Sequence, residues 1–170
     1  MTALQKKRML AAFAAIMLCS AACLVALHAP LFSPARAVAA PFLWGYATLI
    51  NGLWLPLLIA YRALQRGIDP QQMGGDTPVA SASLMTARVL QNTLEQTVVA
   101  VVATALLAVS HAPLAGNLLL VQVGCFAIGR PLFWWGYHGH PILRVFGFAL
   151  GFHASLCVYG YAAWFMLRAL

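Results

Sequence analysis

The sequence predicts an all-α integral membrane protein, and three observations carry this prediction. Of its 170 residues, 63% are hydrophobic and only 8% are charged. An ordinary soluble domain is about one-quarter charged, so this chain has too few charges to cover a water-facing surface. Its apolar residues are also gathered into five stretches close to the roughly 20 residues that a membrane-spanning helix needs. We therefore expect one small domain of transmembrane helices.

The first predicted span, residues 9–29, carries no charge and follows a basic run at residues 6–8. A basic start, an apolar stretch and the Ala-Arg-Ala sequence at residues 35–37 are also typical of a signal peptide. The apolar stretch is longer than such a peptide usually has, which favours a retained helix. We predict that residues 1–36 form an extra N-terminal transmembrane helix, with a signal peptide as the alternative, and that residues 37–170 form a four-helix membrane domain.

Four further spans follow, and prolines and glycines mark their irregular points. Pro56 lies inside the second span, while Arg130 and Pro131 interrupt the fourth, where the missing backbone N–H predicts a kink. Gly147 and Gly151 form a Gly-x-x-x-Gly pair on the fifth span, and this spacing lets two helix backbones approach closely. The sequence leaves open whether that approach occurs within one chain or between subunits. The four spans cover residues 37–61, 83–109, 114–137 and 145–167.

Basic residues outnumber acidic ones by ten to three, which gives a net charge of +7. In a soluble protein this excess would suggest nucleic acid. Here the basic residues lie mostly at the ends of apolar runs, and no nucleic-acid-binding motif is present. The positive-inside rule places the N-terminus and the turn-rich loop from Gln65 to Thr86 in the cytoplasm. Arg36 and Arg168 would then lie on the other side.

The third predicted span carries a polar face. Arg88, Asn92 and Glu95 are spaced four and three residues apart, so they lie on one side of a helix. Glu95 is the only glutamate in the chain. An ionised group near the bilayer centre costs about 2.5–3.5 kcal/mol, so it is expected to face protein or water. Arg130 is the expected partner of Glu95, either in a purely structural ion pair or within a binding site.

A second polar group lies in residues 129–144. Arg130, Tyr137 and Arg144 follow one another at intervals of seven residues. In the expected topology, these groups and the polar face of the third span converge at the cytoplasmic ends of the last three helices. Arginine pairs well with carboxylates, and a carboxylate pairs with an ammonium group. The set therefore suits an anionic zwitterion with several carboxylates.

This pattern resembles the MAPEG family, the membrane-associated proteins in eicosanoid and glutathione metabolism, over about residues 40–168. The resemblance implies a four-helix bundle that assembles as a homotrimer and binds glutathione, its co-substrate, between subunits near the cytoplasmic side. Arg144 matches the catalytic arginine that is proposed to stabilise the glutathione thiolate. The residues that the resemblance implies for substrate binding are Arg88, Asn92, Glu95, Arg130 and Tyr137.

The expected function is that of a glutathione transferase, or a peroxidase-like enzyme, acting on a hydrophobic electrophile from the lipid. A nearby cation lowers the pKa of a thiol, and the thiolate is the nucleophile. Phe133 and Gln96 depart from the family pattern, as do Pro131 and the extra first helix, and they leave open a non-catalytic membrane binding or assembly protein. A small transporter or channel is disfavoured, because the polar groups collect near one membrane face.

No metal site is expected. The pair His138 and His140 has no cysteine or acidic partner nearby in the sequence, and it is predicted to lie in a solvated loop. The cysteines form no Cys-x-x-Cys pair, and each is predicted to act as a small hydrophobic residue within an apolar run. The four cysteines are Cys19, Cys23, Cys125 and Cys157.

Overall fold

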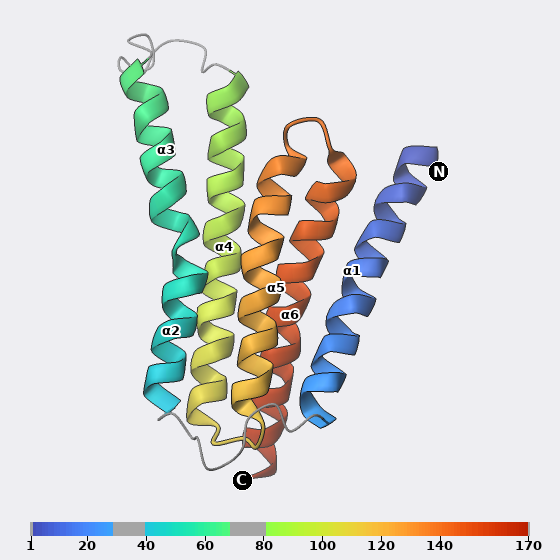
Figure 1. Ribbon diagram of the computed structural model, residues 1–170, viewed down its shortest axis with the longest axis vertical. Coiled ribbons are helices and arrows are strands. Elements are labelled where there is room, and N and C mark those ends of the chain that lie inside the picture. Colours follow the sequence, from blue (N-terminus) through green and yellow to red (C-terminus); the bar gives the residue numbers. More distant parts are fainter. Residues whose placement is uncertain (1, 29–39, 69–80, 170) are drawn as a thin grey trace.

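The computed structural model describes residues 2–28, 40–68 and 81–169, and these ranges are almost entirely helical, with no strand among them (Figure 1). The predicted cleavage sequence at residues 35–37 and most of the predicted loop between Gln65 and Thr86 lie outside the described residues. The helices are α1 (Ala3–His28), α2 (Ala40–Gly52), α3 (Trp54–Ile68), α4 (Ser81–Val109), α5 (Ala115–Gly136) and α6 (Pro141–Arg168).

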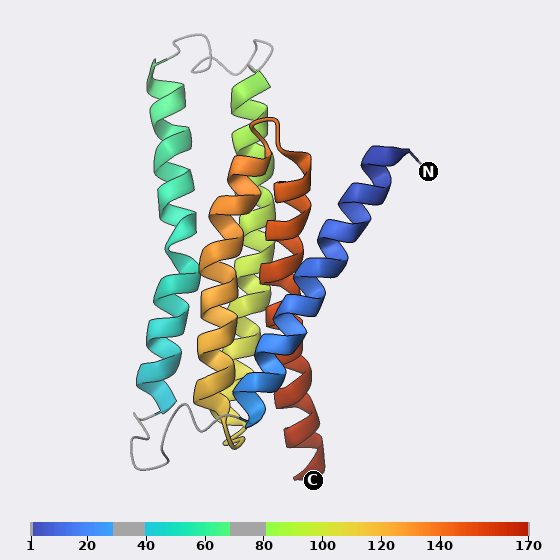
Figure 2. The same cartoon turned by 45° about the vertical axis from the view of Figure 1, so that its right-hand side comes forward.

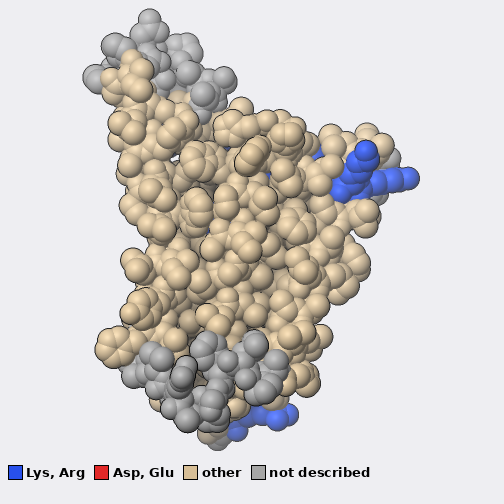
Figure 3. Space-filling model, viewed as in Figure 1, with Lys and Arg blue, Asp and Glu red and all other residues tan. Residues whose placement is uncertain are grey.

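Five helical segments in the described part of the chain are long and apolar enough to cross a membrane. α1, α4, α5 and α6 each make one segment, and α2 and α3 together make another, Phe42–Ile68. Large apolar side chains remain exposed along all five segments. Figure 3 shows this as an uncharged band between the blue basic groups at the two ends of the molecule. The prediction of an all-α membrane protein with five spans is confirmed.

The second span is interrupted at Leu53, between α2 and α3. Pro56 explains the interruption, because it has no N–H to donate to the carbonyl of Gly52 and its ring crowds that carbonyl. Pro56 falls in the first turn of α3, where a missing N–H leaves no helical hydrogen bond unmade. α5, by contrast, stays helical through Pro131.

Glycines bring α5 and α6 into backbone contact. A Cβ at Gly129 would lie 2.7 Å from the carbonyl oxygen of Gly147, and a Cβ at Gly136 would overlap the backbone of Arg144. A Cβ at Gly151 would lie 3.4 Å from Oε1 of Gln96 on α4. The Gly-x-x-x-Gly pair therefore packs within the chain, which resolves the alternative that the sequence left open.

The extra helix α1 packs on α6 and α5 through small side chains. Ala15, Cys19, Cys23 and Ala26 are its buried residues, and all four lie in its C-terminal half or near its middle. Figure 2 shows the N-terminal end of α1 standing away from the other helices, while its C-terminal half lies against them. Near the C-terminal end of α1, Nδ2 of Asn117 on α5 donates a hydrogen bond of 3.0 Å to the carbonyl of Ala26.

A buried chain of polar side chains links α2, α5 and α6. Asn51 donates to Gln122 at 3.0 Å, Gln122 donates to Ser155 at 3.3 Å, and Ser155 donates to the Gly151 carbonyl at 3.0 Å. Because lipid offers no hydrogen bonds, polar groups in spanning helices must find partners in neighbouring helices. These bonds set the rotation of the three helices relative to one another.

Most of the described basic side chains lie at one end of the bundle. That end contains the start of α1, the end of α3, the start of α4 and the α5–α6 turn (Figure 1). Arg168 lies at the opposite end, at the close of α6. The basic residues at the end that contains the α5–α6 turn are Lys6, Lys7, Arg8, Arg62, Arg66, Arg88 and Arg144.

Candidate functional site

Arg130 is the centre of the polar cluster. Its side chain is 2% exposed, although it is among the largest and most polar in the chain. Nη2 donates a hydrogen bond of 2.6 Å to Oε1 of Gln96, and Nη1 donates one of 3.3 Å to Oδ1 of Asn92. Both acceptors are on α4, one helical turn apart. Two amides of α4 therefore hold a guanidinium that projects from α5.

Aromatic rings connect Arg130 to the α5–α6 turn. The Arg130 guanidinium lies 4.8 Å from the centre of the Phe133 ring, and Phe133 meets Tyr137 edge-to-face at 5.3 Å. The Arg144 guanidinium, at the start of α6, lies 4.9 Å from the centre of the Tyr137 ring. A cation over an aromatic ring contributes about 0.5–2 kcal/mol, depending on how far it is desolvated. Two cations and two rings thus form one continuous row of contacts.

Glu95 does not form the expected ion pair with Arg130. It is exposed, and its Oε1 accepts a hydrogen bond of 2.9 Å from Nε2 of Gln91. Successive residues on an α-helix are separated by about 100°, so Glu95 points well away from the direction of Gln96. Gln96, which was predicted only as a departure from the family pattern, is the nearest acceptor of Arg130.

The structure therefore divides the six predicted site residues into two groups. Asn92, Arg130, Tyr137 and Arg144 belong to one connected cluster through the contacts above. Arg88 and Glu95 lie on the exposed side of α4.

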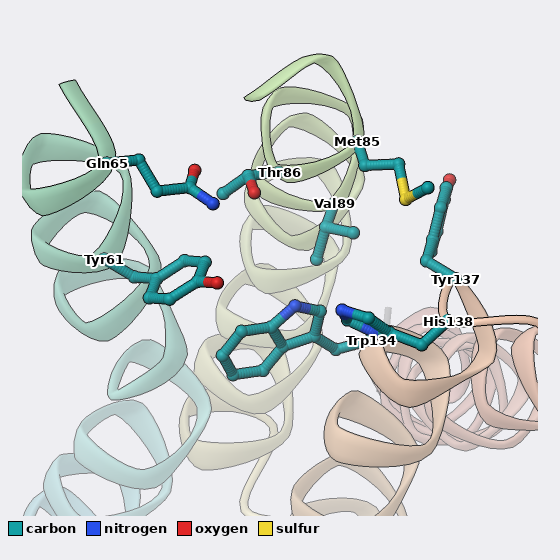
Figure 4. A pocket seen from close by; sticks show the side chains of 8 residues that line it. All are labelled: Tyr61, Gln65, Met85, Thr86, Val89, Trp134, Tyr137 and His138. Atoms are coloured by element: carbon teal, nitrogen blue, oxygen red, sulfur yellow. The ribbon is translucent and has the colours of Figure 1, made fainter. Parts of the chain in front are cut away.

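A cavity of about 150 Å³ lies beside this cluster, between α3, α4 and the end of α5 (Figure 4). Tyr61 and Gln65 line one side, and Met85 and Tyr137 line the other. The cavity is smaller than the 300–1,000 Å³ typical of ligand pockets, so it can take only part of a peptide-sized ligand. Its remaining lining residues are Thr86, Val89, Trp134 and His138.

Among the residues that line the cavity, only Tyr137 was predicted from the sequence to be a site residue. Tyr61 meets Trp134 edge-to-face at 5.4 Å, which closes the cavity between α3 and α5. A more open hollow of about 400 Å³ lies next to it, and the two share Trp134 and His138. Aromatic side chains at the end of a span are equally typical of residues that anchor a helix at the membrane interface. The sequence therefore did not indicate a cavity here.

Helices of membrane-spanning length, with their polar groups gathered inside the bundle, define an integral, multi-pass helical membrane protein. The chain belongs to the MAPEG family, whose model matches residues 40–164. The match begins with α2 and ends within α6, so α1 lies outside it. No match was found among curated proteins or among solved structures. Family membership supports a membrane function related to glutathione in general.

Proposed function

We propose that the protein is a glutathione-dependent membrane enzyme that acts on a hydrophobic electrophile, as a transferase or in a peroxidase-like reaction. One observation carries the proposal. A buried arginine, held by two amides, is joined through two rings to a half-buried arginine at the end of the bundle. In a protein with 8% charged residues, two cations so close together favour an anionic ligand.

The side chains offer groups that fit glutathione. Arg88 and Arg144 are reachable from outside the chain, and their planar guanidinium groups pair with carboxylates. Glu95 is equally reachable and suits the ammonium group of the peptide. Arg130 keeps one buried donor, Nε, without a hydrogen-bond partner among the described residues. Because an unpaired buried donor is costly, this atom favours a ligand acceptor at the site.

The proposed role of Arg144 is to stabilise the glutathione thiolate. A neighbouring positive charge favours the ionised thiol, whose proton passes to water. The thiolate sulfur then attacks the electrophilic carbon, forming the carbon–sulfur bond while the leaving group departs with its electron pair. The cavity beside Tyr137 has mainly apolar walls, which suits an electrophile that arrives from the lipid.

We also propose that the site is completed by neighbouring chains in a homotrimer, on the cytoplasmic side. Glu95 is near the middle of α4, where an ionised carboxylate facing lipid is unfavourable. In one chain it is exposed, and among the described residues its hydrogen-bond partner is Gln91. A second chain covering this side of α4 would remove that cost and enlarge the small cavity. The cytoplasmic orientation rests on the basic side chains gathered at this end.

The proposal is tested with Arg144→Leu, using Arg168→Leu as a matched control. Both arginines lie over an aromatic ring, Arg144 over Tyr137 and Arg168 over Trp164 at 4.2 Å, but at opposite ends of the bundle. We expect Arg144→Leu to lower the rate of glutathione conjugation to a hydrophobic aryl halide by about 10²–10³-fold, the usual effect of losing one stabilising group. Arg168→Leu should retain the rate.

Equal rates in the two variants would remove the catalytic assignment of Arg144. A second candidate function is a non-catalytic binding or assembly protein, and the use of Gln96 and Phe133 to hold Arg130 favours it. Equilibrium dialysis with glutathione, run beside the rate assay, separates the two functions. Binding without turnover, or no binding, supports the non-catalytic protein.

A further inference from the structure

All four cysteines of the chain meet at one place in the bundle. Cys19 and Cys23 come from α1, Cys125 from α5 and Cys157 from α6. The sulfur atoms of Cys19, Cys23 and Cys157 all lie within 4.8 Å of one another. The Cys125 thiol lies close enough to the Cys19 thiol to interact with it. From the sequence, each cysteine was predicted to be a separate hydrophobic residue, because no two cysteines on different helices are close in the chain.

A histidine accompanies the thiols. His153 precedes Cys157 by one turn of α6 and lies close enough to its thiol to interact with it. The other contact of the imidazole is with α1, where Oγ of Ser20 lies 3.0 Å from Nε2 of His153. Histidines that bind metals usually have their second ring nitrogen fixed by a hydrogen bond of this kind. The group therefore contains thiols, an imidazole and a residue that orients the imidazole.

We propose that this cluster binds a thiophilic metal ion with a filled d shell, Zn²⁺ or Cu⁺, through Cys19, Cys23 and Cys157. A fourth ligand would come from Cys125 or His153, which lie near Cys19 and Cys157 respectively. Sulfur ligands select these ions over harder cations. A Zn–S bond of about 2.3 Å in a tetrahedral site places sulfur atoms about 3.8 Å apart. The observed spacing needs an adjustment of about one ångström or less.

The surroundings favour thiolates bound to a metal ion over bare thiolates. Cys19 is 0% exposed and Cys23 is 7% exposed, and both belong to an apolar cluster that includes Ala154 and Val158. When the metal binds, each ligating S–H bond breaks, a metal–sulfur bond forms and the proton leaves to water. The sulfur and the metal keep their oxidation states throughout. The metal charge then offsets most of the thiolate charge with Zn²⁺ and part of it with Cu⁺, which lowers the cost of holding thiolates in an apolar site.

The site would fasten α1 to the family domain. Cys19 and Cys23 precede the family match at residues 40–164, whereas Cys125, His153 and Cys157 lie inside it. Cys157 follows Arg144 by thirteen residues on α6, which corresponds to about 20 Å along the helix. The metal site is therefore separate from the proposed glutathione site. Its occupancy should increase stability by mass action.

The experiment uses the full chain, purified in detergent under reducing conditions, with intact mass to establish that α1 is present. We expect about one equivalent of zinc or copper per chain by elemental analysis. Added Co²⁺ should give the absorption bands of a tetrahedral thiolate complex. A chelator should lower the thermal midpoint, and Zn²⁺ should restore it. These measurements need no variant, so they do not depend on a substituted chain folding.

Variants then assign the ligands. Cys19→Ala and Cys157→Ala should each reduce the metal content to background, while His140→Ala, in the α5–α6 turn, should retain it. A reduced chain with less than about a tenth of an equivalent of metal and no cobalt bands would overturn the proposal. So would a full metal content in Cys157→Ala. A mass two hydrogens lower before reduction, together with no metal after it, would also overturn it, in favour of a disulfide between helices.

Discussion

Gln96→Leu tests whether Arg130 is held mainly by α4, as the 2.6 Å bond from Nη2 to Oε1 of Gln96 indicates. Hydrogen bonds between transmembrane helices contribute about 0.6 kcal/mol on average and up to about 1.7 kcal/mol. A bond with one charged partner is about twice as strong as a neutral one. Arg130 is 2% exposed and cannot turn to water. We therefore expect the free energy of unfolding to fall by about 1–3 kcal/mol.

The matched control is Gln91→Leu, five residues earlier on the same helix. Gln91 is exposed, and within the part of the chain that the structure describes its side chain bonds the exposed Glu95 alone, so its loss should change stability by less than about 0.5 kcal/mol. Unfolding in detergent, followed by circular dichroism, compares the two variants. A companion Arg130→Met in the Gln96→Leu background should recover much of the loss, because both members of the pair are then apolar. Equal destabilisation by Gln96→Leu and Gln91→Leu would refute this reasoning.

Three further predictions concern the helix packing and the site. Gly147→Ala should destabilise the bundle by more than about 2 kcal/mol, because the new methyl group would press on the Gly129 backbone. Gly160→Ala has open space around the new methyl group and should be neutral or stabilising by up to about 1 kcal/mol. Unfolding in detergent measures both variants. Glu95→Gln keeps the shape of the side chain and should weaken glutathione binding about tenfold in equilibrium dialysis, and unchanged affinity would argue against a contact with the peptide ammonium. Pro56→Ala restores a backbone N–H and should make the second span one continuous helix, seen as slower hydrogen exchange at the α2–α3 junction.

The number of spans could be predicted from the sequence, and their boundaries agree with the structure to within a few residues at most ends. The largest difference is at the second span, which was predicted to end at residue 61 but continues to Ile68, and the last span also begins earlier, at Pro141, so that it takes in Arg144. A window of apolar residues finds the buried part of a span, whereas a helix also extends through its polar ends. The break at Leu53 was not predicted, although Pro56, its cause, was noted.

The cluster around Arg130 was predicted in part. Asn92, Tyr137 and Arg144 are joined to it as their helical spacing suggested. Glu95 is not joined to the cluster. Spacing along one helix defines which residues share a face, but not which neighbouring helix that face contacts. In this chain Gln96 occupies the direction of α5. The ion pair between Glu95 and Arg130 was predicted because the two side chains have opposite charges. In the structure, amide oxygens of α4 accept the hydrogen bonds from Arg130 in place of the Glu95 carboxylate.

Composition and span length are local properties of the chain, so the sequence alone determined that this is a membrane-embedded helical protein with a polar cluster on its later helices. Which side chains meet depends on how far each helix is rotated about its axis. Backbone contacts at Gly129 and Gly147, together with buried polar bonds such as that from Asn51 to Gln122, set that rotation. These are contacts between distant parts of the chain. They bring Arg130 to Gln96, and they gather cysteines from three helices into one group.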